Sequence, residues 1–229
     1  MSEEPNYHAR YSTVLDVKSA KEHGILVIGA GSIGSWLVRA LVRTGFENVT
    51  VMDFDVVDNV NVYPQGYGLG DVGLDKVEAL YEGIGATLGV EIKPVVDKFE
   101  SKEQVPEGTS YIIPAVDSLA VRQQVFEQAC LLPATELVLD ARMGARHGSI
   151  HAAWMEDTEG VFERYPLSFD ATGVSPLPCT ERNTPFCGMM IGAALAGYVT
   201  SAFLGEQEKL YQRYNFSLFN PAGLLISVD

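Results

Sequence analysis

The amino-acid sequence predicts an α/β domain, in which a mostly parallel sheet carries helices on both faces and continues as antiparallel strands toward the C-terminus. Two observations lead to this prediction. Short aliphatic and β-branched runs, each the length of a buried strand, alternate with segments that repeat apolar residues at helical spacing. The length of 229 residues, with 47% hydrophobic and 20% charged residues, is typical of one large globular domain.

The first strand–helix–strand unit is the clearest part of the pattern. Residues 24–28 form an apolar run that ends in glycines, and residues 32–44 have helical periodicity before Gly45, a helix-stop residue. Residues 49–52 form a second apolar run, which ends at Asp53. Segments in this order and of this length form a βαβ motif, so the sequence predicts a Rossmann-like sheet.

The alternation continues to about residue 140 and then changes. The sequence predicts a glycine-rich loop at 54–73, helices at 74–87 and 118–131, and strands near 90–96, at 111–113 and at 137–139. Beyond these we expect a hairpin of 148–155 with 160–164, an irregular crossover at 165–183, an apolar helix at 185–204, and strands at 214–218 and 224–228. Residues 1–22 are polar, and we expect them to be peripheral.

The charge of the chain excludes some classes of partner. The sequence has 30 acidic and 16 basic residues, a formal net charge of −14. General nucleic-acid binders and proteins that bind anionic membranes need a basic excess, so we expect neither partner. We expect no membrane span, because no run of 18 apolar residues is present, and no signal peptide behind the polar N-terminus. Three sparse cysteines indicate a reducing compartment, and we expect a cytoplasmic protein.

A glycine fingerprint follows the first predicted strand. Gly29, Gly31 and Gly34 form G-x-G-x-x-G where a helix begins. Gly29 permits a tight turn, Gly31 lets a phosphate approach the backbone, and Gly34 lets the helix pack closely on the strand. Asp53 follows about 20 residues later, where a carboxylate can accept hydrogen bonds from ribose hydroxyls. The pattern predicts a nucleotide site and disfavours NADP, whose 2′-phosphate Asp53 would repel, but it fits both ATP and NAD.

A further series of polar residues distinguishes these nucleotides. Asp55, Asn61, Gln65 and Lys76 follow Asp53 at the spacing of the patterns D-x-D-x-V, N-L-x-R-Q and D-V-G-x-x-K. The chain therefore resembles the ThiF/MoeB/HesA family, the enzymes of the ubiquitin-activating type. The resemblance implies one ThiF-like adenylation domain over residues 1–229. It also implies that ATP adenylates the C-terminal glycine of a ubiquitin-like or sulfur-carrier protein.

The resemblance also implies a role for each matching residue. Asp53 would hold the ribose in a nucleotide site that includes the three glycines and Asp55, while Asn61 and Gln65 would orient the phosphates. Lys76 would neutralise phosphate charge, and Asp117, after the predicted strand at 111–113, would hold Mg²⁺. Both Lys76 and Asp117 would then be catalytic, because phosphoryl chemistry depends on positioning and charge neutralisation. From the sequence pattern alone, Lys76 fits a solvated helix lysine as well, and Asp117 fits the N-cap of the helix at 118–131.

Two departures from the family pattern concern cations. The arginine expected before Gln65 is Pro64, and only the first arginine of the N-terminal R-Y-x-R-Q segment is present. Four arginines are candidates to replace the missing charge: Arg10, Arg122, Arg142 and Arg146. The departures keep a non-catalytic nucleotide-binding module open as an alternative function.

The cysteines receive different expectations. Cys179 lies in Cys-Thr-Glu-Arg-Asn-Thr-Pro, which resembles the segment around the catalytic cysteine of the SUMO-activating enzyme, and the resemblance implies a thioester there. A loop cysteine with a structural role is the alternative. We expect Cys187 and Cys130 to be core cysteines. The sequence has no pair of C-x-x-C motifs, so we expect no structural zinc, and His147 and His151 lie on a predicted strand, too far apart to share a metal.

The sequence thus predicts an ATP- and Mg²⁺-dependent adenylyltransferase with a small carrier-protein partner. We expect a homodimer from the resemblance and from the apolar helix at 185–204. The small residues of this helix indicate that it either packs closely inside the fold or faces a second copy. The alternatives are the non-catalytic module and an NAD-dependent oxidoreductase. The oxidoreductase explains Asp53 and the glycines but leaves Asn61, Gln65 and Lys76 unexplained.

Overall fold

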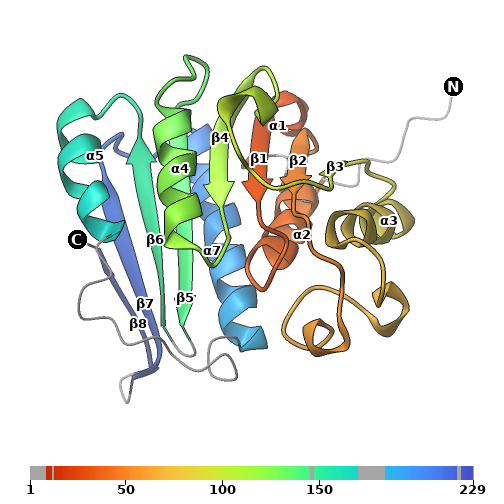
Figure 1. The fold of residues 1–229 in the computed structure, drawn as a ribbon. Helices are drawn as coiled ribbons and strands as arrows, with labels where there is room; N and C mark the ends of the chain where they lie inside the picture. The colour runs from red at the N-terminus through yellow and green to blue at the C-terminus, as the bar shows by residue number, and fades with distance from the viewer. Residues whose placement is uncertain (1–8, 12, 145–146, 170–183, 221–222, 229) are drawn as a thin grey trace, which may run out of the picture.

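The computed structural model describes residues 9–11, 13–144, 147–169, 184–220 and 223–228. An eight-stranded sheet runs through the domain in the order β3-β2-β1-β4-β5-β6-β7-β8 (Figure 1). Strands β1 to β5 pair in parallel, and β6 to β8 extend the sheet with antiparallel pairs. The predicted Rossmann-like α/β class with its antiparallel C-terminal extension is confirmed.

The elements follow the predicted alternation. The strands are β1 (Gly24–Ile28), β2 (Val49–Met52), β3 (Lys93–Val95), β4 (Thr109–Pro114), β5 (Leu137–Gly144), β6 (His147–Trp154), β7 (Gln212–Asn220) and β8 (Gly223–Val228). The α-helices are α1 (Val17–Glu22), α2 (Gly34–Thr44), α3 (Lys76–Leu88), α4 (Leu119–Ala129), α5 (Thr158–Arg164) and α7 (Pro185–Phe203). Four 3₁₀ turns complete the described elements: η1 (Asn59–Asn61), η2 (Leu69–Asp71), η3 (Lys102–Gln104) and η4 (Pro166–Phe169).

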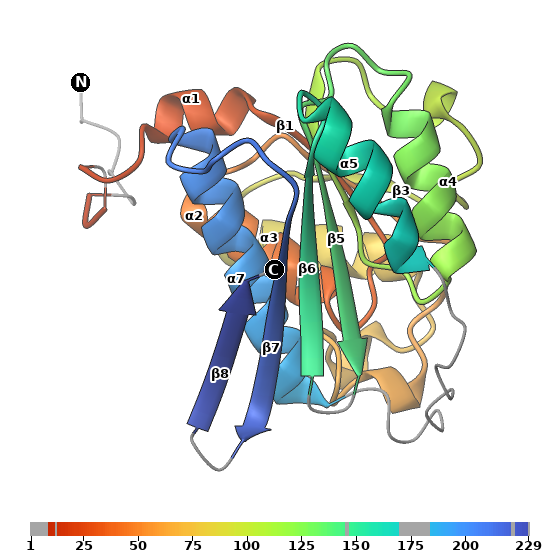
Figure 2. The same ribbon diagram turned by 90° about the vertical axis from the view of Figure 1, so that its left-hand side faces the viewer.

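The sheet separates two apolar layers. Ile25 and Val27 of β1 face the layer that contains α2, α3 and α7, whereas Leu26 and Ile28 face the layer that contains α4 and α5. In Figure 2 the strands lie between α2 and α7 on one side and α4 and α5 on the other. Because both faces are covered, β1 is buried along its whole length, which explains its continuous apolar run.

Local signals set the ends of two helices. Gly45 ends α2 with a φ of 115°, in the left-handed region that favours glycine. Helix α4 is capped by Ser118, whose hydroxyl accepts a hydrogen bond from the Val121 backbone N–H at 3.3 Å. The alternative prediction, that Asp117 is the N-cap of this helix, is therefore wrong by one residue. The Asp117 carboxylate does not cap α4.

The predicted hairpin of 148–155 with 160–164 is wrong in its second half. Strand β6 pairs instead with β5 before it and with β7, and α5 occupies Thr158–Arg164. The Asp157 carboxylate caps α5 by accepting a hydrogen bond from the Gly160 backbone N–H at 2.9 Å. The helix buries Val161 and leaves Phe162 half exposed, a one-sided pattern that is too short to be distinguished from a strand by periodicity.

Helix α7 packs one face against α2 and leaves residues such as Met189 exposed. A Cβ atom on Gly188 would lie 2.3 Å from the Ser32 backbone oxygen, and one on Gly192 would lie 2.9 Å from the Leu37 backbone nitrogen. These contacts explain why the predicted 185–204 helix has glycine at 188 and 192. By length and composition alone, α7 is the one helix of the described residues that could cross a membrane, and half of that window is buried inside the domain.

Candidate functional site

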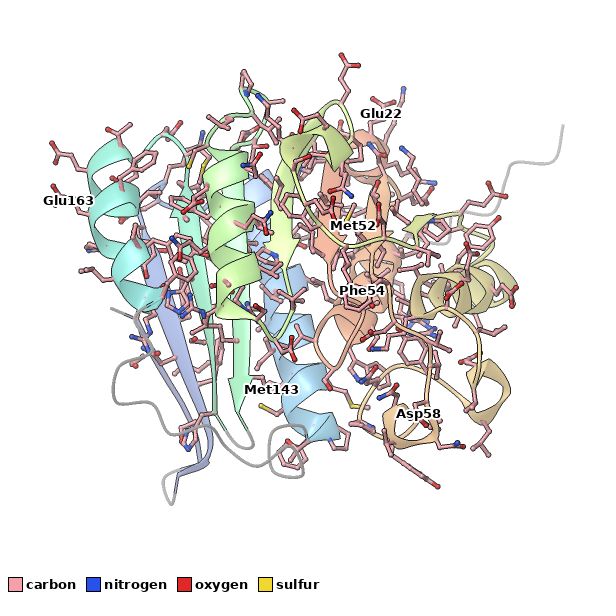
Figure 3. The ribbon with its side chains drawn as sticks, in the orientation of Figure 1. Glu22, Met52, Phe54, Asp58, Met143 and Glu163 are labelled. Carbon is pink, nitrogen blue, oxygen red and sulfur yellow. The ribbon has the colours of Figure 1, made fainter. Side chains whose placement is uncertain are left out.

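A cleft of about 800 Å³ opens where β1, β2 and β4 end. The order of the strands reverses at β1, which lies between β2 and β4, and ligands of such sheets bind at the carboxyl ends of the strands beside this reversal. Figure 3 labels three residues that line the cleft: Met52 and Phe54 at the end of β2, and Met143 on β5. Seven of the predicted site residues also line it: Gly29, Gly31, Asp53, Asp55, Gln65, Lys76 and Asp117.

The three glycines have the geometry that a phosphate loop needs. Gly29 has a φ of 101°, and a Cβ atom there would lie 2.8 Å from the Ala115 backbone oxygen. A Cβ atom on Gly34 would lie 1.9 Å from the Gly29 oxygen, so Gly34 allows α2 to start directly against the loop. Gly31 is different, since no atom lies within 4 Å of a Cβ built on it. The fingerprint therefore combines two packing glycines with one that keeps the cleft open.

Asp53 holds the loop from the end of β2. One carboxylate oxygen accepts a hydrogen bond from the Ala30 backbone N–H at 2.6 Å, and the other accepts one from the Asp55 backbone N–H at 2.8 Å. Asp53 remains partly exposed in the cleft. A carboxylate oxygen accepts more than one hydrogen bond, so ribose hydroxyls can bind Asp53 without displacing the backbone contacts.

Two polar atoms of the cleft are buried without a hydrogen bond. The Ser32 hydroxyl, in the glycine loop just before α2, and the Gln65 Oε1 atom have no hydrogen-bond partner within the described part of the chain. Buried polar atoms are almost always paired in native proteins. Four unpaired ones occur among the described residues, and two of them lie in this cleft, where a polar ligand can pair with both. Helix α2 starts beside them without a side-chain cap, and its free N–H groups favour a phosphate.

Lys76 reaches the cleft from the first turn of α3. Its Nζ atom lies 2.8 Å from a carboxylate oxygen of Asp55, and the side chains are 8% and 50% exposed. The alternative interpretation of Lys76 as a solvated helix lysine is therefore wrong. An ammonium group has three donors, so pairing with Asp55 leaves others that can face phosphates.

The cleft is acidic overall, and its carboxylates are candidate ligands for Mg²⁺. Among the described residues, five carboxylates and three cations line it: Asp53, Asp55, Asp97, Glu100 and Asp117, against Lys76, Lys98 and Arg122. The described residues contain no cluster of three His, Cys, Asp or Glu side chains for a metal. Mg²⁺ bound with a nucleotide needs only one or two carboxylates, because phosphates supply further ligands. The exposed Asp117 carboxylate fits that requirement.

Other predicted residues lie elsewhere. Asn61 does not line the cleft, and its side-chain oxygen accepts a hydrogen bond from the Asp58 backbone N–H at 2.9 Å within η1. Cys179 lies outside the described residues. Cys187 is buried in the core as predicted, and burial raises the pKa of its thiol to about 11. Cys130 ends α4 and is only partly buried, and burial raises the pKa of its thiol.

The structure adds two cleft residues that the sequence motifs do not identify. Phe54 is about half exposed, and the Lys98 ammonium lies 4.5 Å from the centre of its ring. Lys98 follows β3, far from the glycine fingerprint in sequence. Its place in the cleft could be predicted only from the pairing of β3 with β2. Pro64, in place of the family arginine, accepts a hydrogen bond from the Trp36 indole at 3.4 Å through its backbone oxygen.

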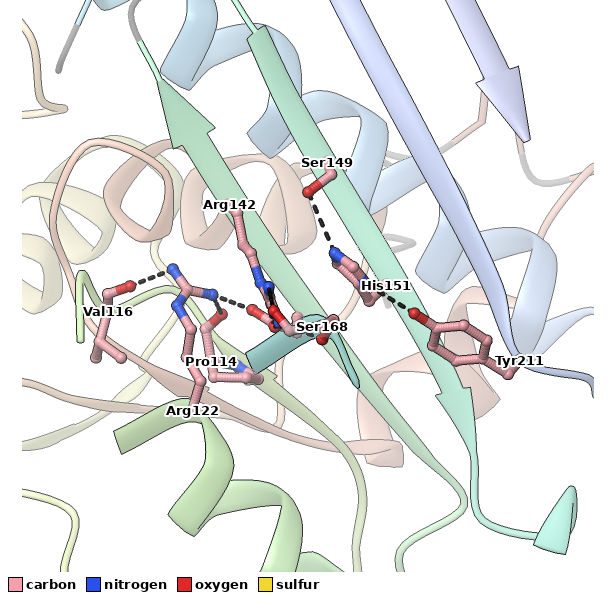
Figure 4. Close-up of polar contacts among 9 residues, drawn as sticks. Pro114, Val116, Arg122, Arg142, Ser149, His151, Ser168 and Tyr211 are labelled. Atoms are coloured by element: carbon pink, nitrogen blue, oxygen red, sulfur yellow. Dashed lines mark hydrogen bonds and ion pairs between the residues drawn. The ribbon is translucent and has the colours of Figure 1, made fainter. Parts of the chain in front are cut away.

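Arg122 and Arg142, two of the candidate replacement arginines, converge on one buried carboxylate beside the cleft (Figure 4). Asp140 on β5 is fully buried, which would raise its pKa, but the two guanidinium groups outweigh this effect and hold the pKa below its usual value. Arg142 also donates to the backbone oxygen and the hydroxyl of Ser168 in η4, at 2.6 and 2.8 Å. Both arginines thus pair with Asp140, and the three side chains together keep one net positive charge.

The same close-up contains a buried histidine. The two ring nitrogens of His151 lie 2.8 Å from the Tyr211 hydroxyl and 3.3 Å from the Ser149 hydroxyl (Figure 4). Burial, together with the positive charge of Arg142, lowers the pKa of His151 to about 3. His151 is therefore neutral at physiological pH.

Similarity to known proteins extends over most of the chain. Residues 8–222 match the ThiF family. The chain is 39% identical over 105 residues to the tRNA threonylcarbamoyladenosine dehydratase of Escherichia coli, covering 42% of this chain and 37% of that protein. It is 30% identical over 120 residues to the adenylyltransferase and sulfurtransferase UBA4 of Yarrowia lipolytica, covering 51% and 30%. It is 34% identical over 109 residues to the NEDD8-activating enzyme E1 catalytic subunit of Arabidopsis thaliana, covering 46% and 24%.

Solved structures share the fold at low sequence identity. Escherichia coli MccB superimposes with a TM-score of 0.73 at 16% identity, over 99% of this chain and 72% of MccB. The Escherichia coli tRNA N6-threonylcarbamoyladenosine dehydratase TcdA, solved with ATP, gives a TM-score of 0.63 at 18% identity, over 91% of this chain and 100% of that chain. The match to the curated relatives spans less than half of their length. With the family match over most of its length, the chain belongs to the ThiF family.

Proposed function

We propose that this protein binds ATP in the cleft at the ends of β1, β2 and β4 and adenylates the C-terminal carboxylate of a ubiquitin-like or sulfur-carrier protein. The observation that carries the nucleotide part is the pair of buried, unpartnered atoms, Ser32 Oγ and Gln65 Oε1, beside the open Gly31. The Ser32 hydroxyl can donate to a phosphate oxygen, and the Gln65 carboxamide can both donate and accept. Family membership supports ATP-dependent adenylation.

The proposed reaction is an in-line displacement at phosphorus. A carboxylate oxygen of the carrier attacks the α-phosphorus of ATP, the bond to the bridging oxygen of the β-phosphate breaks, and pyrophosphate leaves. Asp53 would fix the ribose, and Lys76 would offset negative charge on the phosphates. Mg²⁺, held by Asp117 and by phosphate oxygens, would neutralise further charge and orient the leaving group.

The choice of a protein carrier has two supports. The relative UBA4 is named an adenylyltransferase and sulfurtransferase, and another relative is named a subunit of the NEDD8-activating enzyme. MccB, which shares the fold, has been solved together with MccA. The charge of −14 disfavours a tRNA, because the phosphates of a polynucleotide would be repelled. The identity to tRNA threonylcarbamoyladenosine dehydratases nevertheless makes adenylation of a tRNA-borne carboxylate the second candidate.

ATP–pyrophosphate exchange tests the proposal. Purified protein with Mg²⁺ is incubated with labelled pyrophosphate and one of three additions: small proteins that end in glycine and are encoded beside it, bulk tRNA, or buffer. Carrier-dependent exchange is expected. Exchange that depends on tRNA would support the second candidate. ATP binding without exchange would favour the non-catalytic module, and tighter binding of NAD than of ATP would favour an oxidoreductase.

A second step is also proposed at Cys179. Its thiolate would attack the carbonyl carbon of the acyl adenylate, so that a thioester forms and AMP leaves. Replacement of Cys179 by Ala should then leave pyrophosphate exchange unchanged and abolish a conjugate that dithiothreitol releases. A conjugate that persists in this variant would assign the step to another residue.

Assembly and location remain part of the proposal. We infer a homodimer in the cytoplasm, since the apolar Met189 on α7 is exposed and the cysteines are few. Sedimentation velocity at several protein concentrations tests the dimer, and a single species of monomer mass would contradict it.

A further inference from the structure

Arg122 holds the backbone that carries Asp117. Its guanidinium donates to the backbone oxygen of Pro114 at 3.1 Å, to the backbone oxygen of Val116, and to the Asp140 carboxylate. Arg122 is 4% exposed and Asp140 is fully buried. One planar group therefore ties β5 to the carbonyl groups of Pro114, which ends β4, and of Val116, which immediately precedes Asp117.

The turn held in this way is a wall of the nucleotide cleft. Ala115 donates its backbone N–H to the Ile28 oxygen at 2.7 Å, and its own oxygen would lie 2.8 Å from a Cβ atom on Gly29. Asp117 itself is exposed, so packing does not fix its side chain, and the backbone on which it sits decides where its carboxylate points. A shift of the Val116 peptide group would therefore move the Asp117 carboxylate directly.

The geometry favours a positioning task over direct neutralisation of phosphate. Three of the five donors of Arg122 serve fixed acceptors within the domain, and one of these acceptors is the buried Asp140 carboxylate. Lysine would keep the charge and could still reach Asp140, but a single ammonium nitrogen cannot reproduce a planar fork that reaches both carbonyl groups and the carboxylate. Charge and positioning can thus be separated by one substitution.

We propose that Arg122, anchored by Asp140, is a positioning residue that fixes the turn at 115–117 so that Asp117 can hold the Mg²⁺ of bound MgATP. The inference rests on the proposed function, because it requires that ATP binds in this cleft with Mg²⁺ at Asp117. It separates Arg122 from Arg142, which contacts the other oxygen of Asp140 and Ser168.

Calorimetric titration with the ATP analogue AMPCPP tests this inference without any turnover. The intact protein and its variants are titrated at limiting and at saturating Mg²⁺, and the Mg²⁺ concentration that gives half of the maximal affinity is determined. Arg122→Lys should raise this concentration about 10- to 100-fold, the range typical of replacing a residue that holds a metal ligand in place. Affinity at saturating Mg²⁺ should stay close to that of the wild type.

Arg142→Lys is the matched control, because it changes the other arginine on Asp140 and contacts no carbonyl group of β4. It should leave the Mg²⁺ dependence unchanged. Asp140→Asn, which weakens the anchor but keeps the arginine fork, should shift the dependence in the same direction as Arg122→Lys and by less. This second variant keeps the test open if Arg122→Lys does not fold, as judged by its thermal unfolding.

Three results would overturn the inference. The first is an unchanged Mg²⁺ dependence in Arg122→Lys, or in Asp140→Asn if only that variant folds. The second is an equal shift in Arg142→Lys. The third is a loss of AMPCPP affinity in Arg122→Lys that saturating Mg²⁺ does not restore, because Arg122 would then contact the nucleotide itself. Failure of the proposed function is distinct, since the wild type would then show no Mg²⁺-dependent binding.

Discussion

Replacement of Asp53 by Ala should remove the protein's ability to distinguish ATP from 2′-deoxy-ATP. The Asp53 carboxylate already accepts hydrogen bonds from the Ala30 and Asp55 backbone N–H groups, so the variant will also loosen the glycine loop. A simple loss of ATP affinity would therefore not show what Asp53 contacts. The ratio of the two affinities does, because loosening of the loop affects both nucleotides equally.

The size of this ratio follows from the hydrogen bond to the 2′-hydroxyl. A hydrogen bond to an ionised group contributes about 1.5–3 kcal/mol, and about 1.4 kcal/mol corresponds to a tenfold change in affinity. Asp53 is partly exposed, so the lower half of the range applies. The wild type should prefer ATP by about 10- to 40-fold, and the preference should fall close to unity in Asp53→Ala.

Calorimetric titration of both nucleotides into both proteins forms a double-mutant cycle. Asp97→Ala is the control, since it removes another carboxylate that lines the same cleft, and it should keep the preference for ATP. If Asp53→Ala discriminates as strongly as the wild type, the reasoning is refuted and Asp53 serves only the loop. A loss of discrimination in Asp97→Ala instead would move ribose recognition to the end of β3.

Three further predictions concern charge, pH and packing. Lys76→Ala should lower the rate of pyrophosphate exchange about 10²–10³-fold with a smaller effect on ATP affinity, and an equal loss in both would contradict a role in the transition state. Because the pKa of His151 is lowered from 6.5 to about 3, the unfolded chain binds this proton first as the pH falls. The free energy of unfolding should therefore decrease from about pH 6.5 downward, and urea titrations of His151→Gln should show a weaker decrease. Gly188→Ala should destabilise the domain, because a Cβ atom would lie 2.3 Å from the Ser32 oxygen, whereas Gly197→Ala has nothing within 4 Å and should raise stability by up to about 1 kcal/mol. Equal melting temperatures for the two glycine variants would contradict the described contact.

The parallel half of the fold could be predicted because its determinants are local. β1 and β2 are buried on both faces and therefore appear as continuous apolar runs, and Gly45 marks the end of α2 in the chain itself. Helix α5 was predicted as a strand, since seven residues with one buried Val161 carry almost no periodic signal. The N-cap Asp157 is a local signal for this helix, but an aspartate is also typical of a turn between two strands.

The site was predictable to the extent that its residues follow one another in a motif. Gly31 and Asp53 reach the same cleft because strand ends converge at one edge of a parallel sheet. Gln65 and Lys76 reach it from the segment that connects β2 to α3 and from the first turn of α3. Lys98 and the pairing of Arg122 with Asp140 depend on contacts between distant segments, for which a single sequence holds no signal. Asn61 has the family spacing, yet its side chain serves the Asp58 turn.

The contact between Gly188 and Ser32 has a consequence for folding. The glycine loop of the cleft belongs to the first βαβ unit, whereas helix α7, which packs against it, lies in the last third of the chain. Contacts of such long sequence separation form late, because a long loop must close before they contribute any stability. During synthesis, β1, α2 and β2 can assemble early as a local unit, but the phosphate loop acquires its final support only after α7 has emerged. ATP binding would therefore report the completion of folding and not merely its beginning.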